Sequence, residues 1–284
     1  MLRHLLTRGL AVTAFDSDRE RLASLAADWP GKLRAAASLG ELVGCDTVIT
    51  MLPNSRETNQ VLAEGENPLI HVLRPDALVI DMGSSDPVET ARLAGLLNAA
   101  GIQLVDAPVS GSVAKAESGQ LSIMVGADSD LLERARPLLE VMGSIILPTG
   151  RVGSAHAMKA LNNYVYAAGL LAGCEALLAV RAMGLDADTF VDILNASSGR
   201  NVATETKLRQ FILSGSFSGG FSLPLQAKDL ATAKRLGDSA GLDMPQLLRV
   251  ASLWSDAVAV LPAEADNTAI YRYLETLQAS MESV

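Results

Sequence analysis

Short apolar runs alternate with amphipathic stretches along the first half of the chain, from Val12 to about Leu147. Runs rich in Val and Ile are typical of strands, and apolar positions three and four apart are typical of helices. The expected strands are 12–15, 46–52, 77–82, 102–109, 120–126 and 144–147, and the expected helices are 17–29, 56–63, 86–101 and 129–143. This alternation predicts an α/β fold with a mainly parallel sheet covered on both faces.

Two of these expected helices carry clear signals at their ends. Asp86-Pro87 opens one and Gly101 closes it, whereas Asp130 opens the other and Gly143 closes it. Aspartate accepts hydrogen bonds from the first backbone N–H groups of a helix, and glycine tolerates the conformation that ends one.

The strand pattern stops after Gly150, and only helical spacing follows. The expected helices are 154–183, 187–196, 201–213, 225–240, 245–259 and 265–280. The chain is therefore predicted to have an α/β domain at 1–150 and an all-α domain at 151–284, with the boundary near TGRVG at 149–153. Two unlike domains predict a ligand cleft between them.

The composition narrows the classes of partner. A net charge of -9, a sequence pI near 4.9 and the lack of any basic run argue against nucleic-acid binding. The two cysteines, Cys45 and Cys174, cannot form a disulfide framework, which favours a cytoplasmic location. The apolar stretch 164–180 is shorter than the roughly 20 residues of a membrane span and contains Glu175, so a buried helix is expected and no membrane partner.

The opening MLRHLLTRGLAVTAFDSD reads as a helix followed by a strand that ends at Asp16. A helix feeding such a strand is the second half of a nucleotide-binding βαβ unit, in which the acidic residue hydrogen-bonds the ribose of NAD. The alternative is a loop aspartate that caps the helix beginning near Arg19, and Asp16 alone favours neither interpretation.

Three further strand ends carry candidate binding residues. MLPNS at 51–55 places Pro53 after one strand, DMGSSDP at 81–87 places Ser84 and Ser85 after the next, and DAPVSGS at 106–112 ends a third. The carboxyl ends of parallel strands face the ligand crevice of an α/β sheet. In the third motif, Ser110 and Gly111 offer a hydroxyl and N–H groups to a carboxylate. The first two motifs alone are more often simple turns, whereas the third is more informative, although its proline and glycine can simply make a bend.

GSAHAMKALNNY at 153–164 opens the long apolar helix with Lys159, and Asn163 shares its face four residues later. Desolvation would bring the pKa of a lysine toward neutrality, which suits an acid/base group, but a salt bridge between domains deserves equal weight. His156, on the same face, is expected to be structural. In QAKDL at 226–230, Lys228 and Asp229 are expected to form a solvated pair.

Taken together, these motifs resemble the β-hydroxyacid dehydrogenase family across essentially the whole chain. The order TMLPNS, DMGSSDP, DAPVSGS, GSAHAMKALNNY, ILNASSGR and GFSLPLQAKDL matches that family, and the last two look most like its 3-hydroxyisobutyrate dehydrogenase branch. The resemblance implies a Rossmann-type domain, a homodimer or homotetramer, and metal-free interconversion of a short 3-hydroxy acid and its semialdehyde with NAD or NADP. Tartronate semialdehyde and succinic semialdehyde reductases are the alternatives inside the family, and a catalytically silent sensor or scaffold is the alternative outside it.

The resemblance also implies the residues of the site. Lys159 would be the catalytic acid/base, and Ser110, Gly111, Asn163 and Phe221 would hold the substrate. The implied cofactor residues are Asp16, Leu52, Pro53, Ser84, Lys228 and Asp229. Asp16 favours NAD over NADP, because a carboxylate repels the 2′-phosphate.

Two features depart from the family pattern. Ser112 stands where the family usually has a second glycine, and the glycine-rich cofactor motif is absent from the sequence. The opening fits the second half of the family's first helix, so we expect that roughly 15–20 residues of strand, glycine turn and helix precede it. A start codon assigned to an internal methionine and a truncated gene product are the two explanations.

Overall fold

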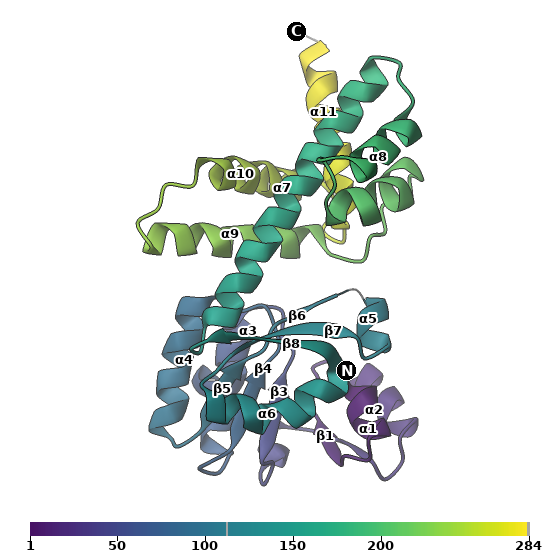
Figure 1. Ribbon diagram of the computed structural model, residues 1–284. Helices are drawn as coiled ribbons and strands as arrows, with labels where there is room; N and C mark the ends of the chain where they lie inside the picture. The colour runs from purple at the N-terminus through teal and green to yellow at the C-terminus, as the bar shows by residue number, and fades with distance from the viewer. Residues whose placement is uncertain (112, 283–284) are drawn as a thin grey trace. The chain divides into compact units, whose positions relative to one another are not determined.

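The computed structural model describes residues 1–111 and 113–282, and the chain divides into a unit at Met1–Lys159 and a unit at Ala160–Val284. The first unit, drawn in purple to teal in Figure 1, is the α/β part. Its strands are β1 (Val12–Ala14), β2 (Leu33–Ala35), β3 (Thr47–Thr50), β4 (Leu78–Asp81), β5 (Gln103–Asp106), β6 (Val109–Ser110), β7 (Leu121–Gly126) and β8 (Gly143–Gly150). Its helices are α1 (Leu2–Thr7), α2 (Arg19–Ala27), η1 (Leu39–Leu42), α3 (Ser55–Asn59), η2 (Gln60–Glu64), η3 (Leu69–His71), α4 (Pro87–Ala99), α5 (Val113–Glu117) and α6 (Ser129–Met142).

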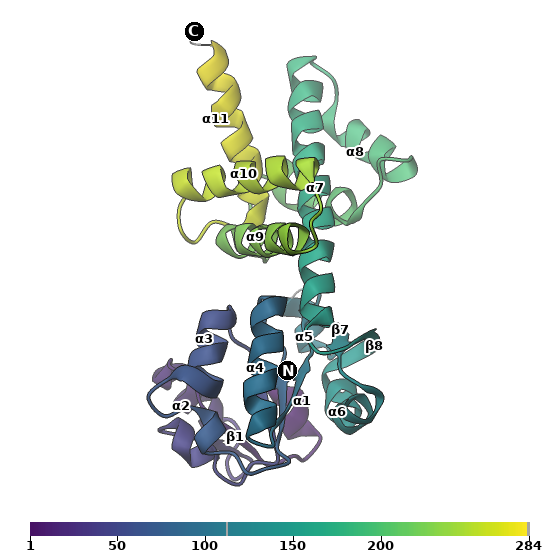
Figure 2. The ribbon, with the colours of Figure 1, turned by 90° about the vertical axis from the view of Figure 1, so that its left-hand side faces the viewer.

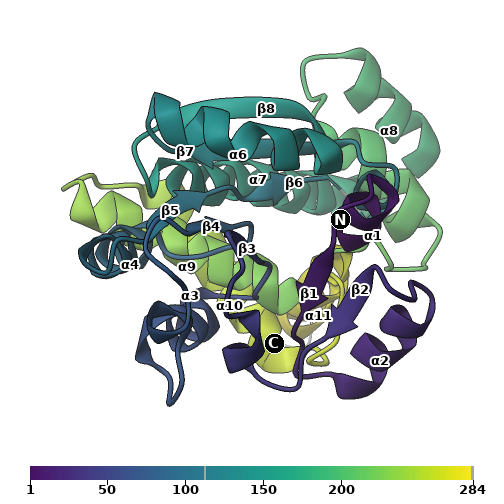
Figure 3. The same ribbon diagram turned by 90° about the horizontal axis from the view of Figure 1, so that it is seen from below.

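The described strands form two separate ladders. One has six strands in the order β3-β4-β5-β7-β6, with β8 paired along β7 from Leu121 to Gly126, and the other is the parallel pair β1-β2. Pairs β3-β4, β4-β5 and β7-β8 are parallel, whereas β7 runs antiparallel to β5 and β6. Figure 3 shows β1 and β2 as a pair beside β3. The predicted mainly parallel sheet is confirmed, and the expectation of one further strand in it stays a prediction.

Helices cover both faces of the larger sheet, because alternate residues of its central strands point to opposite sides. In β4, Ile80 packs toward α6 and α1, and Val79 packs toward α4. In β5, Val105 and Leu104 divide in the same way. Figure 3 shows α6 and α4 on opposite sides of these strands. The central strands are therefore fully buried, which fits their unbroken apolar runs.

Local details of this unit differ from the sequence prediction in three places. The strand β2 was not predicted, because its three residues include the exposed Arg34 and lack an apolar run. The expected helix 56–63 is an α-helix that continues as the π-helix η2. The predicted cap Asp130 is wrong: Asp128 caps α6 by accepting a hydrogen bond from the Leu131 N–H, whereas Asp130 lies in the first turn.

The second unit consists of helices, drawn from teal to yellow in Figure 2. They are α7 (Ser154–Ala182), which begins in the first unit, α8 (Ala187–Ala196), the π-helix η4 (Thr204–Leu213), α9 (Leu223–Ser239), α10 (Pro245–Val260), η5 (Asn267–Ala269) and α11 (Ile270–Glu282). Helices α9 and α10 lie side by side (Figures 1 and 2). The predicted all-helical second half is confirmed.

The long helix α7 supplies the centre of that unit's core. Among the described helices, it is the one whose length and composition would allow it to cross a membrane. Its residues Leu170, Cys174 and Leu177 are fully buried with Trp254 of α10 and Tyr271 of α11. Burial raises the pKa of the Cys174 thiol far above its usual range, as in an unreactive core cysteine. This packing agrees with the predicted buried helix.

Candidate functional site

Three parallel strands end in register on polar residues. The register pairs Thr50 of β3 with Asp81 of β4, and Asp81 with Asp106 of β5. All three residues are buried, and Asp106 is 0% exposed. Buried carboxylates are costly unless they accept hydrogen bonds. The hydrogen-bond donors to these two aspartates therefore show which segments are fixed at this edge of the sheet.

Asp81 joins the loops that follow β3 and β4. Its Oδ1 accepts hydrogen bonds from Thr50 Oγ1 at 2.9 Å and from the Gly83 N–H at 3.1 Å, and its Oδ2 accepts one from Ser85 Oγ at 2.8 Å. A Cβ at Gly83 would lie 2.5 Å from the Leu52 carbonyl oxygen, so glycine is required for the close approach of the two loops. The loop residues predicted to line a cofactor are thereby held against each other.

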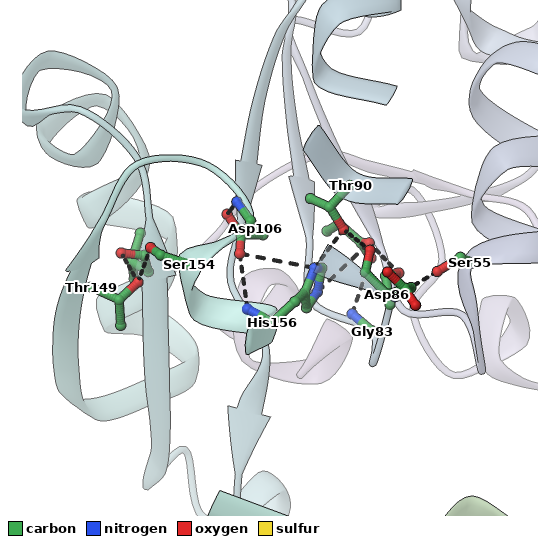
Figure 4. Close-up of polar contacts among 12 residues, drawn as sticks. Ser55, Gly83, Asp86, Thr90, Asp106, Thr149, Ser154 and His156 are labelled. Atoms are coloured by element: carbon green, nitrogen blue, oxygen red, sulfur yellow. Dashed lines mark hydrogen bonds and ion pairs between the residues drawn. The ribbon is translucent and has the colours of Figure 1, made fainter. Parts of the chain in front are cut away.

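Asp106 binds the start of α7. Its Oδ1 accepts a hydrogen bond from the Gly153 N–H at 2.7 Å, and its Oδ2 accepts one from the His156 N–H at 2.9 Å. Figure 4 shows this carboxylate beside the first turn of the helix. Burial raises the pKa of the Asp106 carboxyl above its usual value, and His156 and the two N–H groups act against that rise. Asp106 thus caps the start of α7 although Gly153, just before that helix, lies 47 residues after it in the sequence.

The ring of His156 lies between the two aspartates. Its Nδ1 is 2.9 Å from Thr90 Oγ1 and 3.9 Å from Asp106 Oδ2, and its Nε2 is 3.8 Å from Asp81 Oδ2. Thr90 donates its single hydroxyl proton to the Asp86 carbonyl oxygen at 2.9 Å. The Thr90 hydroxyl thus lies within hydrogen-bond distance of both the Asp86 carbonyl oxygen and the His156 ring. Figure 4 shows the ring directed toward Thr90.

The predicted residues of the first unit gather around this edge. Leu52 and Pro53 follow β3, Ser84 follows β4 and is half-buried, and Ser110 and Gly111 follow β5. Ser110 was expected at the end of a parallel strand. It lies instead in β6, which pairs antiparallel with β7. Gly111 has φ +138°, a conformation that favours glycine. Ser112 lies outside the described residues.

Lys159 is half-buried and is the last residue of the first unit. It lies three residues after His156, less than one helical turn along α7. His156 on the same helix is 1% exposed, so the start of α7 carries a buried ionisable residue before Lys159.

A second polar cluster lies in the helical unit. Asp229 of α9 accepts a hydrogen bond from Asn163 Nδ2 of α7 at 2.5 Å, and its other oxygen lies 3.0 Å from Lys228 Nζ. Gln226 Nε2 donates to the Asn163 carbonyl oxygen at 3.2 Å. The expected solvated pair is wrong for Asp229, whose side chain is 3% exposed, whereas that of Lys228 is 24% exposed. Phe221 is half-buried before α9, and its N–H donates to Asp266 at 3.0 Å.

Asp16, the predicted ribose ligand, lies just after β1. Asp16 is exposed, and its Oδ1 accepts a hydrogen bond from the Asp18 N–H at 2.9 Å. The alternative role as a helix cap is wrong, because Asp18 caps α2 through the Arg21 N–H. The exposed carboxylate at this strand end, together with the joined loops after β3 and β4, fits the ribose and nicotinamide parts of a dinucleotide.

Two family models cover nearly the whole chain. The model of the NAD-binding domain of 6-phosphogluconate dehydrogenase matches residues 1–153, and that of the NAD-binding domain of NADP-dependent 3-hydroxyisobutyrate dehydrogenase matches residues 153–274. The chain belongs to the β-hydroxyacid dehydrogenase family. As a β-hydroxyacid dehydrogenase it is an oxidoreductase that uses a nicotinamide dinucleotide, which confirms the predicted enzyme class and cofactor type.

Relatives of this β-hydroxyacid dehydrogenase match it over almost their full length. The 2-(hydroxymethyl)glutarate dehydrogenase of Eubacterium barkeri is 32% identical over 277 residues, covering 98% of this chain and 91% of the relative. The NAD-dependent L-serine dehydrogenase of Pseudomonas aeruginosa is 30% identical over 284 residues, covering 98% and 94%. The structure of Mycobacterium tuberculosis 3-hydroxyisobutyrate dehydrogenase with L-serine is 28% identical with a TM-score of 0.84, covering 95% and 93%.

Sequence reasoning missed Asp81 and Asp106 as members of this site. Both are the last residues of apolar strands, in VID and LVD, and a charged residue closing such a run is the signal that could have marked them. No such signal marked the position of the His156 ring between these residues. Its partners lie on β4, β5 and α4, which are far from it in the sequence. Over the described residues no cluster of His, Cys, Asp and Glu forms a metal site.

Proposed function

We propose that this enzyme interconverts a short 3-hydroxy acid and its semialdehyde, with NAD as the preferred cofactor. The observation that carries the proposal is chemical: the substrates named for the three relatives all bear a primary alcohol on the carbon next to the one that holds the carboxylate. A site for this pattern needs a carboxylate clamp, a proton acceptor for the alcohol and a hydride acceptor at fixed spacing.

The substrate carboxylate is assigned to Ser110 and Gly111. The Ser110 hydroxyl and the backbone N–H groups of this segment are hydrogen-bond donors, and they follow β5 at the same edge as the loops after β3 and β4. Asn163 and Phe221 are assigned to the rest of the substrate. Asn163 has its Nδ2 committed to Asp229, which fixes the direction of its side chain.

Lys159 is assigned as the acid/base. In oxidation, its neutral amine takes the proton of the substrate hydroxyl, and in reduction its ammonium donates that proton back to the aldehyde oxygen. The bound nicotinamide accepts or delivers the hydride. Support for this role comes from the half-buried position of Lys159 and from its place one turn after the capped start of α7. General acid/base groups contribute about 10²–10⁴-fold to such rates.

The cofactor is assigned to residues from both units. Leu52, Pro53 and Ser84 would line the nicotinamide side, and Asp16 would accept hydrogen bonds from the ribose hydroxyls. Lys228 is assigned to the cofactor on the family resemblance, with Asp229 as its ion-pair partner. A carboxylate at Asp16 disfavours the 2′-phosphate of NADP by charge repulsion, which is why NAD is proposed.

A paired substrate screen tests this proposal. We expect kcat/KM with NAD to be highest for 3-hydroxyisobutyrate, L-serine, 2-(hydroxymethyl)glutarate or glycerate, all of which carry the primary alcohol next to the carboxylate-bearing carbon. The matched control is 4-hydroxybutyrate, which separates the two groups by one more carbon and corresponds to a succinic semialdehyde reductase. Higher efficiency with 4-hydroxybutyrate than with all four 3-hydroxy acids would contradict the proposed substrate class.

A further inference from the structure

The start of α7 is held by a residue far away in the sequence rather than by the residue just before the helix. The first N–H groups of a helix have no partner within it, and most caps come from the preceding residue. Here the Gly153 and His156 N–H groups both donate to Asp106, at 2.7 and 2.9 Å. The position of the first turn of α7 is therefore set by the end of β5.

The neighbouring strand leaves room for this carboxylate. Gly126 of β7 is paired with Asp106, and a Cβ at Gly126 would lie 2.1 Å from Asp106 Oδ1 and 2.7 Å from its Cγ. No other residue type fits there without moving the Asp106 side chain. Asp106 is 0% exposed, so water does not compete for its two oxygens. The contact between Asp106 and the start of α7 is thus closely packed and shielded from solvent.

His156 ties the same turn to two further elements. Its Nδ1 is hydrogen-bonded to Thr90 Oγ1 of α4 at 2.9 Å, and its Nε2 lies 3.8 Å from Asp81 Oδ2 without a hydrogen-bond partner in the described part of the chain. Asp81 in turn holds the loops after β3 and β4. The first turn of α7 is consequently connected to the ends of β3, β4 and β5.

We propose that Asp106 and His156 are positioning residues that set Lys159 relative to the loops of the active site. Asp106 precedes Ser110 by four residues and holds the turn that carries Lys159, so one carboxylate fixes the separation of the proposed carboxylate clamp and the proposed acid/base. The inference rests on the proposed role of Lys159. A displacement of about 1 Å at a reacting group can cost about 100-fold in rate, which is the effect a loosened turn would have.

The first test is Asp106→Asn. The amide has one acceptor oxygen, so one of the two N–H groups at the start of α7 loses its partner while the side-chain volume is kept. We expect kcat to fall by about 100-fold with KM changed less than about threefold, because the groups that bind the substrate stay. Hydrogen exchange of the Gly153 and His156 amides should become about tenfold faster. Asp128→Asn, the same change at the cap of α6, should move neither quantity.

A second pair of variants keeps the test independent of a folding failure. Thr90→Val removes the hydrogen-bond partner of His156 Nδ1 at equal volume, and Thr90→Ser retains it. We expect Thr90→Val to lower kcat by about tenfold and Thr90→Ser to restore it to within about twofold. Unchanged exchange of the first-turn amides in Asp106→Asn, or equal kcat for Thr90→Val and Thr90→Ser, would overturn the inference.

Failure of this inference and failure of the proposed function give different results. If Lys159 is not the acid/base, Lys159→Ala keeps substantial activity whatever the amide exchange shows. If Lys159 is the acid/base but the turn is not held as we infer, Lys159→Ala is inactive, and Asp106→Asn keeps both its kcat and the slow exchange of the Gly153 and His156 amides. The amide exchange is measured without substrate or cofactor, so it reports on positioning alone.

Discussion

Two buried aspartates, one in each unit, differ in the kind of group that they bind. Asp106 accepts both of its principal hydrogen bonds from backbone N–H groups of α7. Asp229 instead contacts side chains, the Asn163 amide and the Lys228 ammonium. A carboxylate bound to backbone fixes a whole helical turn, whereas one bound to side chains fixes only those side chains. The two aspartates are similarly buried, but Asp106 fixes a helical turn and Asp229 fixes side chains.

One partner differs from the others in its exposure. His156 and Gly153 beside Asp106 and Asn163 beside Asp229 are buried, whereas the Lys228 side chain is 24% exposed. An exposed ammonium on a flexible stem can change its position when a ligand arrives, and a buried helical turn cannot. Within the first unit, Lys159 thus follows a rigid, buried turn, whereas within the helical unit Lys228 is an adjustable arm.

The largest expected difference is between asparagine variants of the two aspartates. Asp106→Asn should act through kcat by about 100-fold, because it shifts the turn that carries Lys159. Asp229→Asn should lower kcat/KM by about tenfold and mainly raise KM, because it disturbs the side chains assigned to substrate and cofactor. Steady-state kinetics of both variants at matched folded fractions measure this. A similar loss of kcat in both would remove the distinction.

Asp16 extends the comparison to an exposed aspartate that has no structural duty beyond its own loop. Asp16→Ser should raise the efficiency with NADP relative to NAD by about tenfold, equivalent to about 1.4 kcal/mol, by removing the repulsion of the 2′-phosphate. The free energy of unfolding should stay within about 0.5 kcal/mol of that of the unchanged protein. Kinetics with both cofactors and denaturant unfolding are the measurements. An unaltered cofactor ratio would exclude Asp16 from the ribose site.

The pH dependence of stability gives a smaller effect that is specific to Asp106. Burial raises its pKa in the folded state above the ordinary value of 3.8, so its favourable contribution is fully present below that value and is lost as pH rises through the raised pKa. The loss of unfolding free energy in Asp106→Asn should therefore be greatest near pH 3.8 and shrink as the pH rises. Denaturant unfolding at a series of pH values tests this. A cost that grows with pH would mean that the two N–H groups outweigh burial.

The smallest effect is expected at the adjustable arm. Lys228→Met should lower the free energy of unfolding by less than about 1 kcal/mol, since a partly exposed ion pair contributes little. The matched control is Lys234→Met, which removes the 2.7 Å ion pair with Asp238 one turn later on the exposed side of α9. The free energies of unfolding of the two variants should differ by less than about 0.5 kcal/mol. A markedly larger loss at Lys228 would make the arm a structural anchor like Asp106.

The sequence was sufficient for the elements whose patterning is long and regular. The central strands β4 and β5 are apolar on both faces, and α4 has Asp86-Pro87 at its start, so both kinds of element were predictable. The three-residue β2 was not predictable, because it leaves no periodic signal of its own. The helix expected at 201–213 is present as η4, but its π-helical form was not predicted. Asp128 and Asp130 are both plausible caps by spacing, and only the geometry of the helix start selects Asp128.

The candidate site was predictable only in part, for a physical reason. Lys159, Ser110 and Lys228 stand in motifs whose residue types suit binding and proton transfer within a short stretch of chain. The connection from Asp106 to His156 spans 50 residues, and that from Thr90 to His156 spans 66. Such pairs form only once strands and helices are in register, so no local pattern could indicate them.

Lys159→Arg is the most direct test of the central claim, that Lys159 exchanges the substrate proton from a fixed turn of α7. Arginine keeps the positive charge and the length of the side chain but cannot lose its proton at working pH. We expect kcat for oxidation to fall by about 10³-fold while the dissociation constant for NAD changes less than about threefold. Retention of more than about a tenth of the original kcat by Lys159→Arg would contradict the account.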